Sequence, residues 1–315
     1  MTTRKKAAVK RRPLPADDDR SARIAGIGLM LLALVCFCML DTTAKWLNHH
    51  IPTLEVLWAR YAGHFALSLI VVNPWTTPGL LKTQRPWLQI FRSIILVGSS
   101  IFNFTALRYL QLDQTAAIMF TTPLFVALAA GPMLGEWIGP RRWAAVLFGF
   151  AGVLLVTRPG AGGIHPAAIL SLLGAICYAL YNITTRILAS YDSTSTTLFY
   201  SALVGLIVST IPIPWAWETP TEPLVIGAMV WMGALGWIGH LFLIMAHRRA
   251  PAPILAPFIY TQIVWMILAG FVVFGDVPNH WTLSGVAVVI VAGLYLLYRE
   301  REMKAKDSLK AQTGE

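Results

Sequence analysis

The sequence predicts an all-α integral membrane protein of ten transmembrane helices, arranged as two inverted five-helix repeats. Three observations lead to this prediction: a low charge content, ten apolar stretches joined by short connections, and a polar pattern that recurs in the second half. Of the 315 residues, 56% are hydrophobic and 13% are charged, about half the charged fraction of an ordinary soluble domain. This composition excludes a soluble enzyme and a disordered chain.

Ten apolar stretches approach the length of about 20 residues that a helix needs to cross a bilayer. Tryptophans, which favour the membrane–water interface, fall at many of their ends. Stretches rich in Pro and Gly separate several of them. The predicted spans are 24–47, 53–72, 91–107, 115–134, 143–157, 166–185, 195–215, 225–247, 253–274 and 281–298.

Basic residues indicate the orientation, because short cytoplasmic loops of membrane proteins are rich in Lys and Arg. Of the 25 Lys and Arg residues, eight precede the first span and five follow the last, and eight more fall in connections on that side, Arg92 among them. Lys45, Arg108 and Arg158 fall on the opposite side, and Arg60 lies within a span. We therefore expect a multi-pass protein of the cell inner membrane with both termini in the cytoplasm.

The expected organisation has four parts: a disordered basic cytoplasmic tail (1–23), a five-helix repeat (24–158), a second five-helix repeat (164–298) and a cytoplasmic C-terminal tail (299–315). The basic residues gather at the two ends, so the positive net charge does not indicate a nucleic-acid partner. The three cysteines all lie in apolar stretches, so neither a disulfide framework nor a metal site is expected. No cofactor is expected either.

A polar pattern recurs between the two halves at an offset of 140 or 141 residues. Residues 31–47 read LLALVCFCMLDTTAKWL, and residues 172–188 read LLGAICYALYNITTRIL. Asp41 thereby corresponds to Asn182, and Asp276 to Glu136. Because each half holds five spans, the second copy enters the membrane from the opposite side. Inverted repeats of this kind are typical of secondary transporters, which bind substrate near the midplane between the repeats.

Over residues 24–298 the chain resembles the drug/metabolite transporter superfamily, in particular its EamA-type ten-helix carriers. The resemblance rests on the two five-span halves, on Trp58–Arg60, on ALRYL at 106–110, and on PLFVALAAGPMLGEWIGPRRWAAVLFGFAGVLLVTRPG at 123–160 with its second copy APFIYTQIVWMILAGFVVFGDVP. It implies a secondary active transporter that moves a small organic metabolite by alternating access. Bacterial uptake carriers for riboflavin and S-adenosylmethionine are similar in style. The candidate substrates are therefore a riboflavin-like cofactor, S-adenosylmethionine, and an amino acid or its derivative.

Polar side chains inside the spans are candidate substrate-binding residues, because such groups are costly in a bilayer. Asp41 in the first span and Asn182 in the sixth occupy corresponding positions, and Tyr178 lies one turn before Asn182 on the same face. We expect this face to point toward a central cavity. A structural ion pair of Asp41 with Lys45 or Arg60 is the alternative for that carboxylate.

Two residues of the second and third spans complete the polar candidates from the first half. Arg60 could bind a carboxylate or phosphate of the substrate, and an ion pair with Asp41 or Glu55 is the favoured alternative. Asn103 in the third span could line the cavity or donate a hydrogen bond between helices.

Aromatic and amide side chains of the ninth span form a further candidate group. Tyr260, Gln262 and Trp265 would suit a planar, hydrogen-bonding metabolite such as a flavin or a nucleobase, and ordinary packing is the alternative. His64 and His240 fall within spans, where a lone histidine is more often a packing residue than a proton relay.

Other features are expected to be structural. Lys45 and Arg186 should extend toward the interface from the ends of their helices, and Glu136 should anchor a loop. Pro123 and Pro257 mark points where helices could bend. Small residues in the fifth and tenth spans favour close helix packing, and they could equally form a homodimer contact.

Two other classes of protein remain as alternatives to a carrier. A membrane-embedded enzyme would need paired acid and base groups, and neither HExxH nor two carboxylates on one helix face occurs within a span. A channel or a receptor would not need inverted repeats. The partners expected are a small-molecule substrate and the lipid bilayer.

Overall fold

The computed structural model describes residues 20–72, 74–75, 77–134, 139–157, 165–188, 191–250 and 255–313. Within these ranges the chain is helical, with connecting turns and no strand. Six helices are long and apolar enough to cross a membrane, and four shorter apolar helices match the remaining predicted spans. The predicted all-α membrane class is confirmed. The predicted N-terminal tail lies mostly outside the described residues.

The helices follow the predicted spans closely, with small shifts at their ends. The first half holds α1 (Arg20–Leu47), α2 (Thr53–Val71), α3 (Pro86–Leu107), α4 (Leu112–Met119), α5 (Thr122–Leu134) and α6 (Pro140–Thr157). The second half holds α7 (Pro166–Leu188), α8 (Thr194–Thr210), α9 (Ile213–Ala216), α10 (Pro223–Arg249), the 3₁₀-helix η1 (Ala256–Thr261), α12 (Gln262–Ala269), the π-helical turn η2 (Gly270–Phe274) and α13 (His280–Thr313).

One boundary changes the interpretation of a charged residue. The third span was predicted to begin at residue 91, with Arg92 counted among the loop residues, but α3 already begins at Pro86. Proline suits the first turn of a helix, where its missing N–H is not needed. Arg92 therefore lies inside the helix, in its second turn.

The predicted fourth and ninth spans are each broken into shorter helices. The fourth divides into α4 and α5 at Phe120–Thr121, immediately before Pro123, which cannot donate a backbone hydrogen bond within a helix. The ninth passes from η1 through α12 into η2, and Pro257 lies in the first turn of η1. Both spans thus have interrupted backbone ladders, as expected for points of bending.

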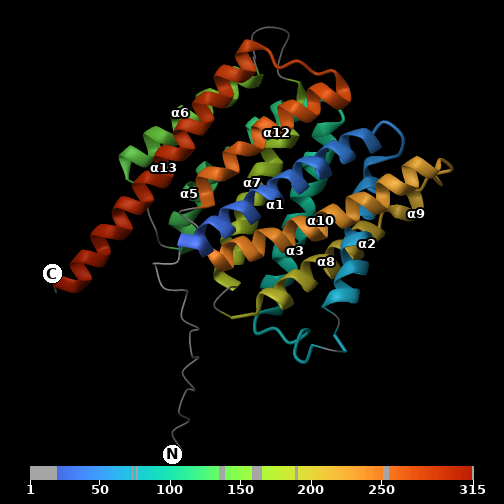
Figure 1. The fold of residues 1–315 in the computed structure, drawn as a ribbon, viewed down its shortest axis with the longest axis horizontal. Helices are drawn as coiled ribbons and strands as arrows, with labels where there is room; N and C mark the ends of the chain where they lie inside the picture. The colour runs from blue at the N-terminus through green and yellow to red at the C-terminus, as the bar shows by residue number, and fades with distance from the viewer. Residues whose placement is uncertain are drawn as a thin grey trace, which may run out of the picture.

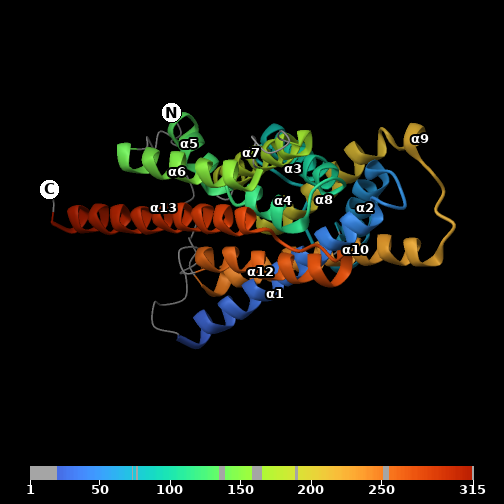
Figure 2. The same cartoon turned by 90° about the horizontal axis from the view of Figure 1, so that it is seen from above.

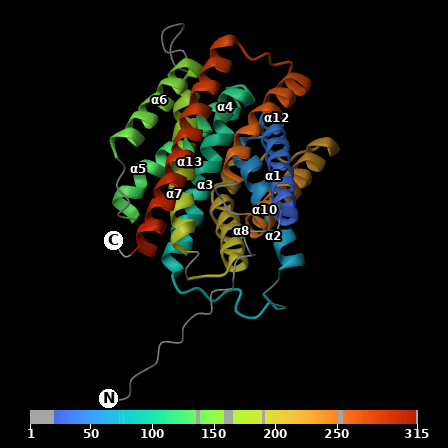
Figure 3. The same ribbon diagram turned by 60° about the vertical axis from the view of Figure 1, so that its left-hand side comes forward.

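The helices of each half pack mainly against helices of the other half. α1 packs along α10, and its counterpart α7 packs along α3 (Figure 1). Likewise α2 contacts α10 and α8 contacts α3, while α2 contacts α8 and α6 contacts α13 directly. Figure 3 shows α5, α6, α7 and α13 on one side of the bundle and α1, α2, α10 and α12 on the other. Exchanging the two halves reproduces this set of contacts, as a two-fold relation between the repeats requires.

Two of these contacts depend on glycine. A Cβ on Gly63 of α2 would lie 2.7 Å from the Cα of Gly233 in α10, and a Cβ on Gly152 of α6 would lie 2.9 Å from the carbonyl oxygen of Gly285 in α13. The small residues of the fifth and tenth spans therefore bring α6 and α13 together within one chain. The final turns of α13 project beyond the bundle (Figure 2).

Candidate functional site

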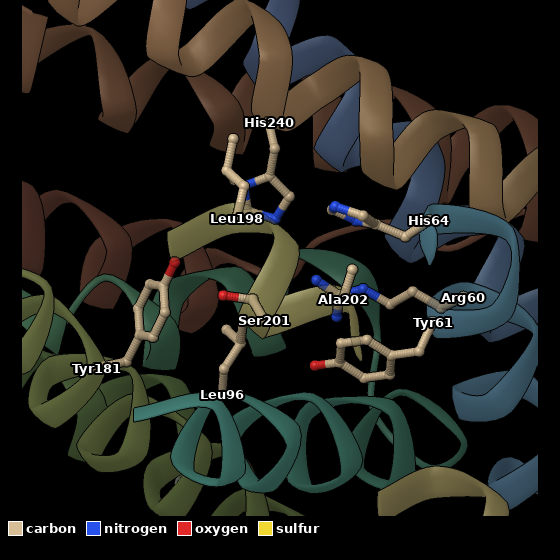
Figure 4. Close-up of a pocket in the computed structure, with 9 residues that line it drawn as sticks. All are labelled: Arg60, Tyr61, His64, Leu96, Tyr181, Leu198, Ser201, Ala202 and His240. Carbon is tan, nitrogen blue, oxygen red and sulfur yellow. The ribbon is translucent and has the colours of Figure 1, made fainter. Parts of the chain in front are cut away.

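A cavity lies where the two halves meet, between α2 and α3 of the first half and α7, α8 and α10 of the second (Figure 4). Its free volume is about 10 Å³, close to the minimum that holds one water molecule. A metabolite could enter this space only if the helices moved apart. The polar residues that line it are Arg60, Tyr61, His64, Tyr181, Ser201 and His240.

The cavity lies between equivalent positions of the two repeats. The offset of 141 residues that relates Asp41 to Asn182 also relates Arg60 in α2 to Ser201 in α8, and both residues line the cavity. α2 and α8 pack against each other. This is the place where inverted-repeat transporters bind their substrates, so the cavity is the candidate binding site.

Arg60 extends from α2 into the cavity and is only partly satisfied there. Its Nη1 donates to Ser100 Oγ of α3 at 2.7 Å, and its guanidinium carbon lies 5.4 Å from the ring centres of Tyr61 and Phe104. Its Nε is buried and has no hydrogen-bond partner among the described residues. Arg60 therefore keeps donor capacity for a ligand.

Asp41 is held beside this arginine but not against it. Asn103 Nδ2 of α3 donates to Asp41 Oδ1 at 3.3 Å, so the structure brings two predicted site residues together. Arg60 is close enough to interact electrostatically with Asp41. No ion pair joins Asp41 to Arg60 or to Lys45 among the described residues, so the structural ion pairs proposed for this carboxylate are absent.

The corresponding face of α7 is aromatic and uncharged. The rings of Tyr178 and Tyr181 are stacked, with centres 5.6 Å apart and planes inclined by 17°. Asn182 Nδ2 donates to the backbone oxygen of Tyr178 at 2.8 Å. Asn182 therefore bonds within its own helix, unlike its counterpart Asp41, and Tyr181 is a cavity residue that the sequence analysis did not identify.

The two histidines of the spans lie next to each other. The rings of His64 in α2 and His240 in α10 are 5.6 Å apart, and Phe37 of α1 meets His240 edge-on at 5.1 Å. Both histidines line the cavity. They form part of the candidate site together, although each was expected to be an isolated packing residue.

Arg92 is the functional candidate that sequence reasoning missed. Its side chain is 1% exposed, and its guanidinium is enclosed by α7 and α8. It donates to Thr185 Oγ1 at 2.6 Å, to Tyr181 OH at 2.8 Å and to Ser201 Oγ at 2.9 Å. Each span was predicted from a stretch between charged residues. Arg92, in the second turn of α3, was therefore assigned to the preceding loop. The early Trp87, an interface marker, was the available signal.

The predicted group of the ninth span lies elsewhere. Tyr260 is buried beside Phe120, with ring centres 5.3 Å apart, and its hydroxyl has no partner among the described residues. Trp265 is 37% exposed on the outer surface. Neither these two residues nor Gln262 lines the cavity.

Lys45 is paired, contrary to the expectation that it reaches toward the interface. Its Nζ lies 2.6 Å from Asp276 Oδ2 and 4.5 Å from the ring centre of Phe274. Gly275, with φ +71°, turns the chain between η2 and α13 so that Asp276 faces the end of α1. A left-handed residue here favours glycine. Glu136 and the side chain of Arg186, which the repeat relates to this pair, lie outside the described residues.

A second polar cluster lies at the end of the bundle opposite the Lys45–Asp276 pair. Asp192, between α7 and α8, accepts hydrogen bonds from Thr83 Oγ1, the Gln84 backbone N–H and Gln89 Nε2. Burial would raise the pKa of Asp192, but these three hydrogen bonds outweigh burial and lower it below its ordinary value. The connection between α2 and α3 is thereby tied to the connection between α7 and α8.

Known proteins resemble this chain over most of its length. The EamA-like transporter family matches residues 24–158 and 165–299. An S-adenosylmethionine uptake transporter of Rickettsia bellii is 30% identical over 89% of this chain and 96% of its own. A riboflavin transporter of Rhizobium johnstonii is 27% identical over 91% and 96%. A protein of known crystal structure shares the fold, with a TM-score of 0.60 at 16% identity over 90% of this chain and 98% of its own.

These findings agree with an all-α membrane protein built from two repeats. The match in each half accounts for the repeat, and the relatives are membrane transporters of small metabolites. The chain belongs to the EamA-like transporter family.

Proposed function

We propose that the protein is a secondary active carrier that takes up an S-adenosylmethionine-like metabolite across the inner membrane by alternating access. The observation that carries the proposal is the presence of a carboxyl group, Asp41, and a guanidinium, Arg60, beside the stacked rings of Tyr178 and Tyr181. The resemblance to S-adenosylmethionine uptake transporters supports the same substrate class.

The chemistry of such a substrate fits the groups available at the cavity. Its carboxylate can pair with Arg60, since guanidinium binds carboxylate in a planar, two-point arrangement. Its sulfonium and ammonium groups can face Asp41. Its adenine can pack against a tyrosine ring in the manner that aromatic faces favour. Riboflavin, the cargo of other relatives, would use the aromatic rings but leave both charges without partners.

Three features of the architecture support alternating access. The cavity has room for about one water molecule, so substrate binding requires the repeats to separate on one side or the other. The broken fourth and ninth spans provide places where the helices can bend. Two inverted copies with equivalent contacts can exchange conformations, which opens the site to one side and then to the other. With both termini in the cytoplasm, the Lys45–Asp276 end would face outward.

A membrane-embedded enzyme is the alternative from another class. Among the described residues that line the cavity, Ser201 carries the one aliphatic hydroxyl group that could act as a nucleophile. Its hydroxyl donates its proton to the Thr197 carbonyl oxygen at 2.8 Å. A serine engaged in this way is not activated as a nucleophile. The arrangement supports binding more than bond cleavage.

Transport by the purified protein in proteoliposomes tests this proposal. Labelled S-adenosylmethionine, riboflavin, amino acids and nucleosides would be offered, with and without a pH gradient. The proposal predicts saturable S-adenosylmethionine uptake and accelerated exchange when the vesicles contain unlabelled substrate. Unsaturable flux would indicate a channel, and conversion of the compound would indicate an enzyme.

A further inference from the structure

Arg92 is a buried cation without a counterion in the part of the chain that the structure describes. Besides the three hydroxyl groups, its Nη1 donates to the Thr197 carbonyl oxygen at 3.3 Å. All four acceptors are uncharged, and no described carboxylate forms an ion pair with it. Neutral acceptors leave the positive charge of Arg92 uncompensated, and a charge interacts more strongly with other charges in a medium of low dielectric constant than in water.

Of the three hydroxyl groups that accept hydrogen bonds from Arg92, two already donate their own proton to a backbone oxygen and one does not. Ser201 gives its proton to the Thr197 carbonyl oxygen, and Thr185 gives its proton to the Tyr181 carbonyl oxygen at 2.6 Å. Tyr181 accepts from Arg92 through its phenolic oxygen, and its own proton has no acceptor among the described residues. Because a hydroxyl has a single proton, Tyr181 is the group of this cluster that can donate to a ligand.

The opposite wall of the cavity is also rich in donors. Ser100 gives its proton to the Leu96 carbonyl oxygen, so it accepts from both Arg60 and Tyr61. Arg60 retains its unpartnered Nε. The cavity thus presents a guanidinium from α2 and a phenol from α7 (Figure 4). A second guanidinium, that of Arg92, donates to this phenol.

We propose that Arg60 and Tyr181 form a subsite for a substrate carboxylate, with Arg92 as the positioning residue that aims Tyr181 and adds positive potential. This inference rests on the proposed function and narrows it: a transported substrate must carry a carboxylate. Arg60 and Arg92 bring two positive charges to this region, and Asp41 is the carboxyl group that interacts with Arg60, so a carboxylate on the ligand would balance the remaining positive charge. A ligand without an anionic group leaves these buried donors unpaired, and unpaired buried donors greatly weaken binding.

The test compares S-adenosylmethionine with its decarboxylated analogue, which differs only in that group. Uptake is measured at zero membrane potential, because removal of the carboxylate changes the net charge of the substrate. We expect the protein to prefer the carboxylated compound by about 100-fold in uptake efficiency. Equal uptake of both compounds overturns the subsite and leaves the proposed carrier intact.

Variants then distinguish positioning from a merely structural role. Tyr181→Phe and Arg92→Gln should each lower uptake of the carboxylated compound by about tenfold or more and leave uptake of the analogue nearly unchanged. Tyr200→Phe removes a tyrosine hydroxyl that bonds to the Leu81 carbonyl oxygen, away from the cavity, and serves as the control. A loss of both activities in equal proportion, in protein that remains folded, contradicts the subsite.

The two proposals can fail separately. Uptake of neither adenosyl compound contradicts the proposed substrate. The same panel then decides the subsite: transport of riboflavin, which has no carboxylate, overturns it. Transport of an amino acid that is abolished when its carboxylate is converted to an amide supports it.

Discussion

α1, α2 and α3 of the first half occupy places around the cavity equivalent to those of α7, α8 and α10 of the second, yet the two sets supply different chemistry. The first set brings the ionisable groups Asp41, Arg60 and Arg92. At corresponding positions the second brings Asn182 and Ser201, which bond to backbone oxygens of their own helices. The repeat therefore explains how the site is framed, and departures from the repeat explain what the site can bind.

The differences between the two halves give the cavity two chemically different sides. A strictly symmetric site would offer the same groups to both ends of a ligand. Here Asp41 lies on α1 and the stacked tyrosines lie on α7, so a ligand with distinct charged and aromatic ends has one preferred orientation. Substitutions that exchange the residues of the two copies test this account most sharply.

The largest effect is expected at the arginine of α2. Arg60→Ala should lower the uptake efficiency of S-adenosylmethionine by about 100-fold, because it removes the cavity-lining charge that pairs with the ligand. Ser201→Ala, at the corresponding position of α8, should lower it by less than about fivefold, since Ser201 donates within its helix. Initial uptake rates in proteoliposomes measure both, with Arg60→Lys as a charge-retaining control. Similar losses for the two alanine variants would mean that the halves contribute alike.

Asp41→Asn gives the first copy the residue of the second. S-adenosylhomocysteine lacks the positive sulfonium of S-adenosylmethionine. The ratio of the uptake efficiencies of S-adenosylmethionine and S-adenosylhomocysteine should fall by about tenfold in the variant, because a charge-assisted contact to the sulfonium is lost. Adding Asn182→Asp should not restore the preference, since residue 182 lies against the Tyr178 carbonyl oxygen of its own helix and a carboxylate has no proton to donate to that oxygen. Competition between the two compounds for uptake measures the preference. Full restoration by the double exchange would show that the positions are interchangeable.

The Lys45–Asp276 pair provides a test of the contact between α1 and the end of the second half. Lys45→Met leaves the Asp276 carboxylate without its partner, so the free energy of unfolding should decrease. Breaking a buried ion pair costs about 3–5 kcal/mol, and we expect a decrease near the lower end of that range because Asp276 is 23% exposed. Thermal denaturation in detergent measures the loss. The exchange Lys45→Asp with Asp276→Lys should recover part of it. If Lys45→Met alone is as stable as the unaltered protein, the pair does not stabilise the fold.

The smallest effect is expected at Asp192, which joins the connections of both halves. Its pKa is lowered in the folded protein, so its ionised form contributes stability above the ordinary pKa of about 3.9. This contribution disappears as the pH falls through the lower folded-state value. Asp192→Asn should lower the thermal midpoint by roughly 1–2 °C at pH 7 and by less at pH 4. A difference that grows toward acid would contradict the assignment.

Much of the fold was predictable because apolar length and a recurring polar pattern are local properties of a sequence. Asp41, Arg60 and Asn103 were identified as polar groups within spans. Arg60 lines the cavity, and Asn103 bonds to Asp41, which interacts with Arg60. The spacing of Tyr260, Gln262 and Trp265 describes one helix, but it does not show which face turns inward, and Trp265 faces outward. The partner of Lys45 lies 231 residues away, so only the folded chain reveals it.

Exchange transport of S-adenosylmethionine tests the central claim most directly. Proteoliposomes loaded with unlabelled compound would receive labelled compound outside, with the unaltered protein and Arg60→Ala in parallel. We expect saturable accumulation that depends on the internal compound and is nearly abolished in Arg60→Ala. Accumulation that neither saturates nor depends on Arg60 would contradict both the carrier mechanism and the site between the repeats.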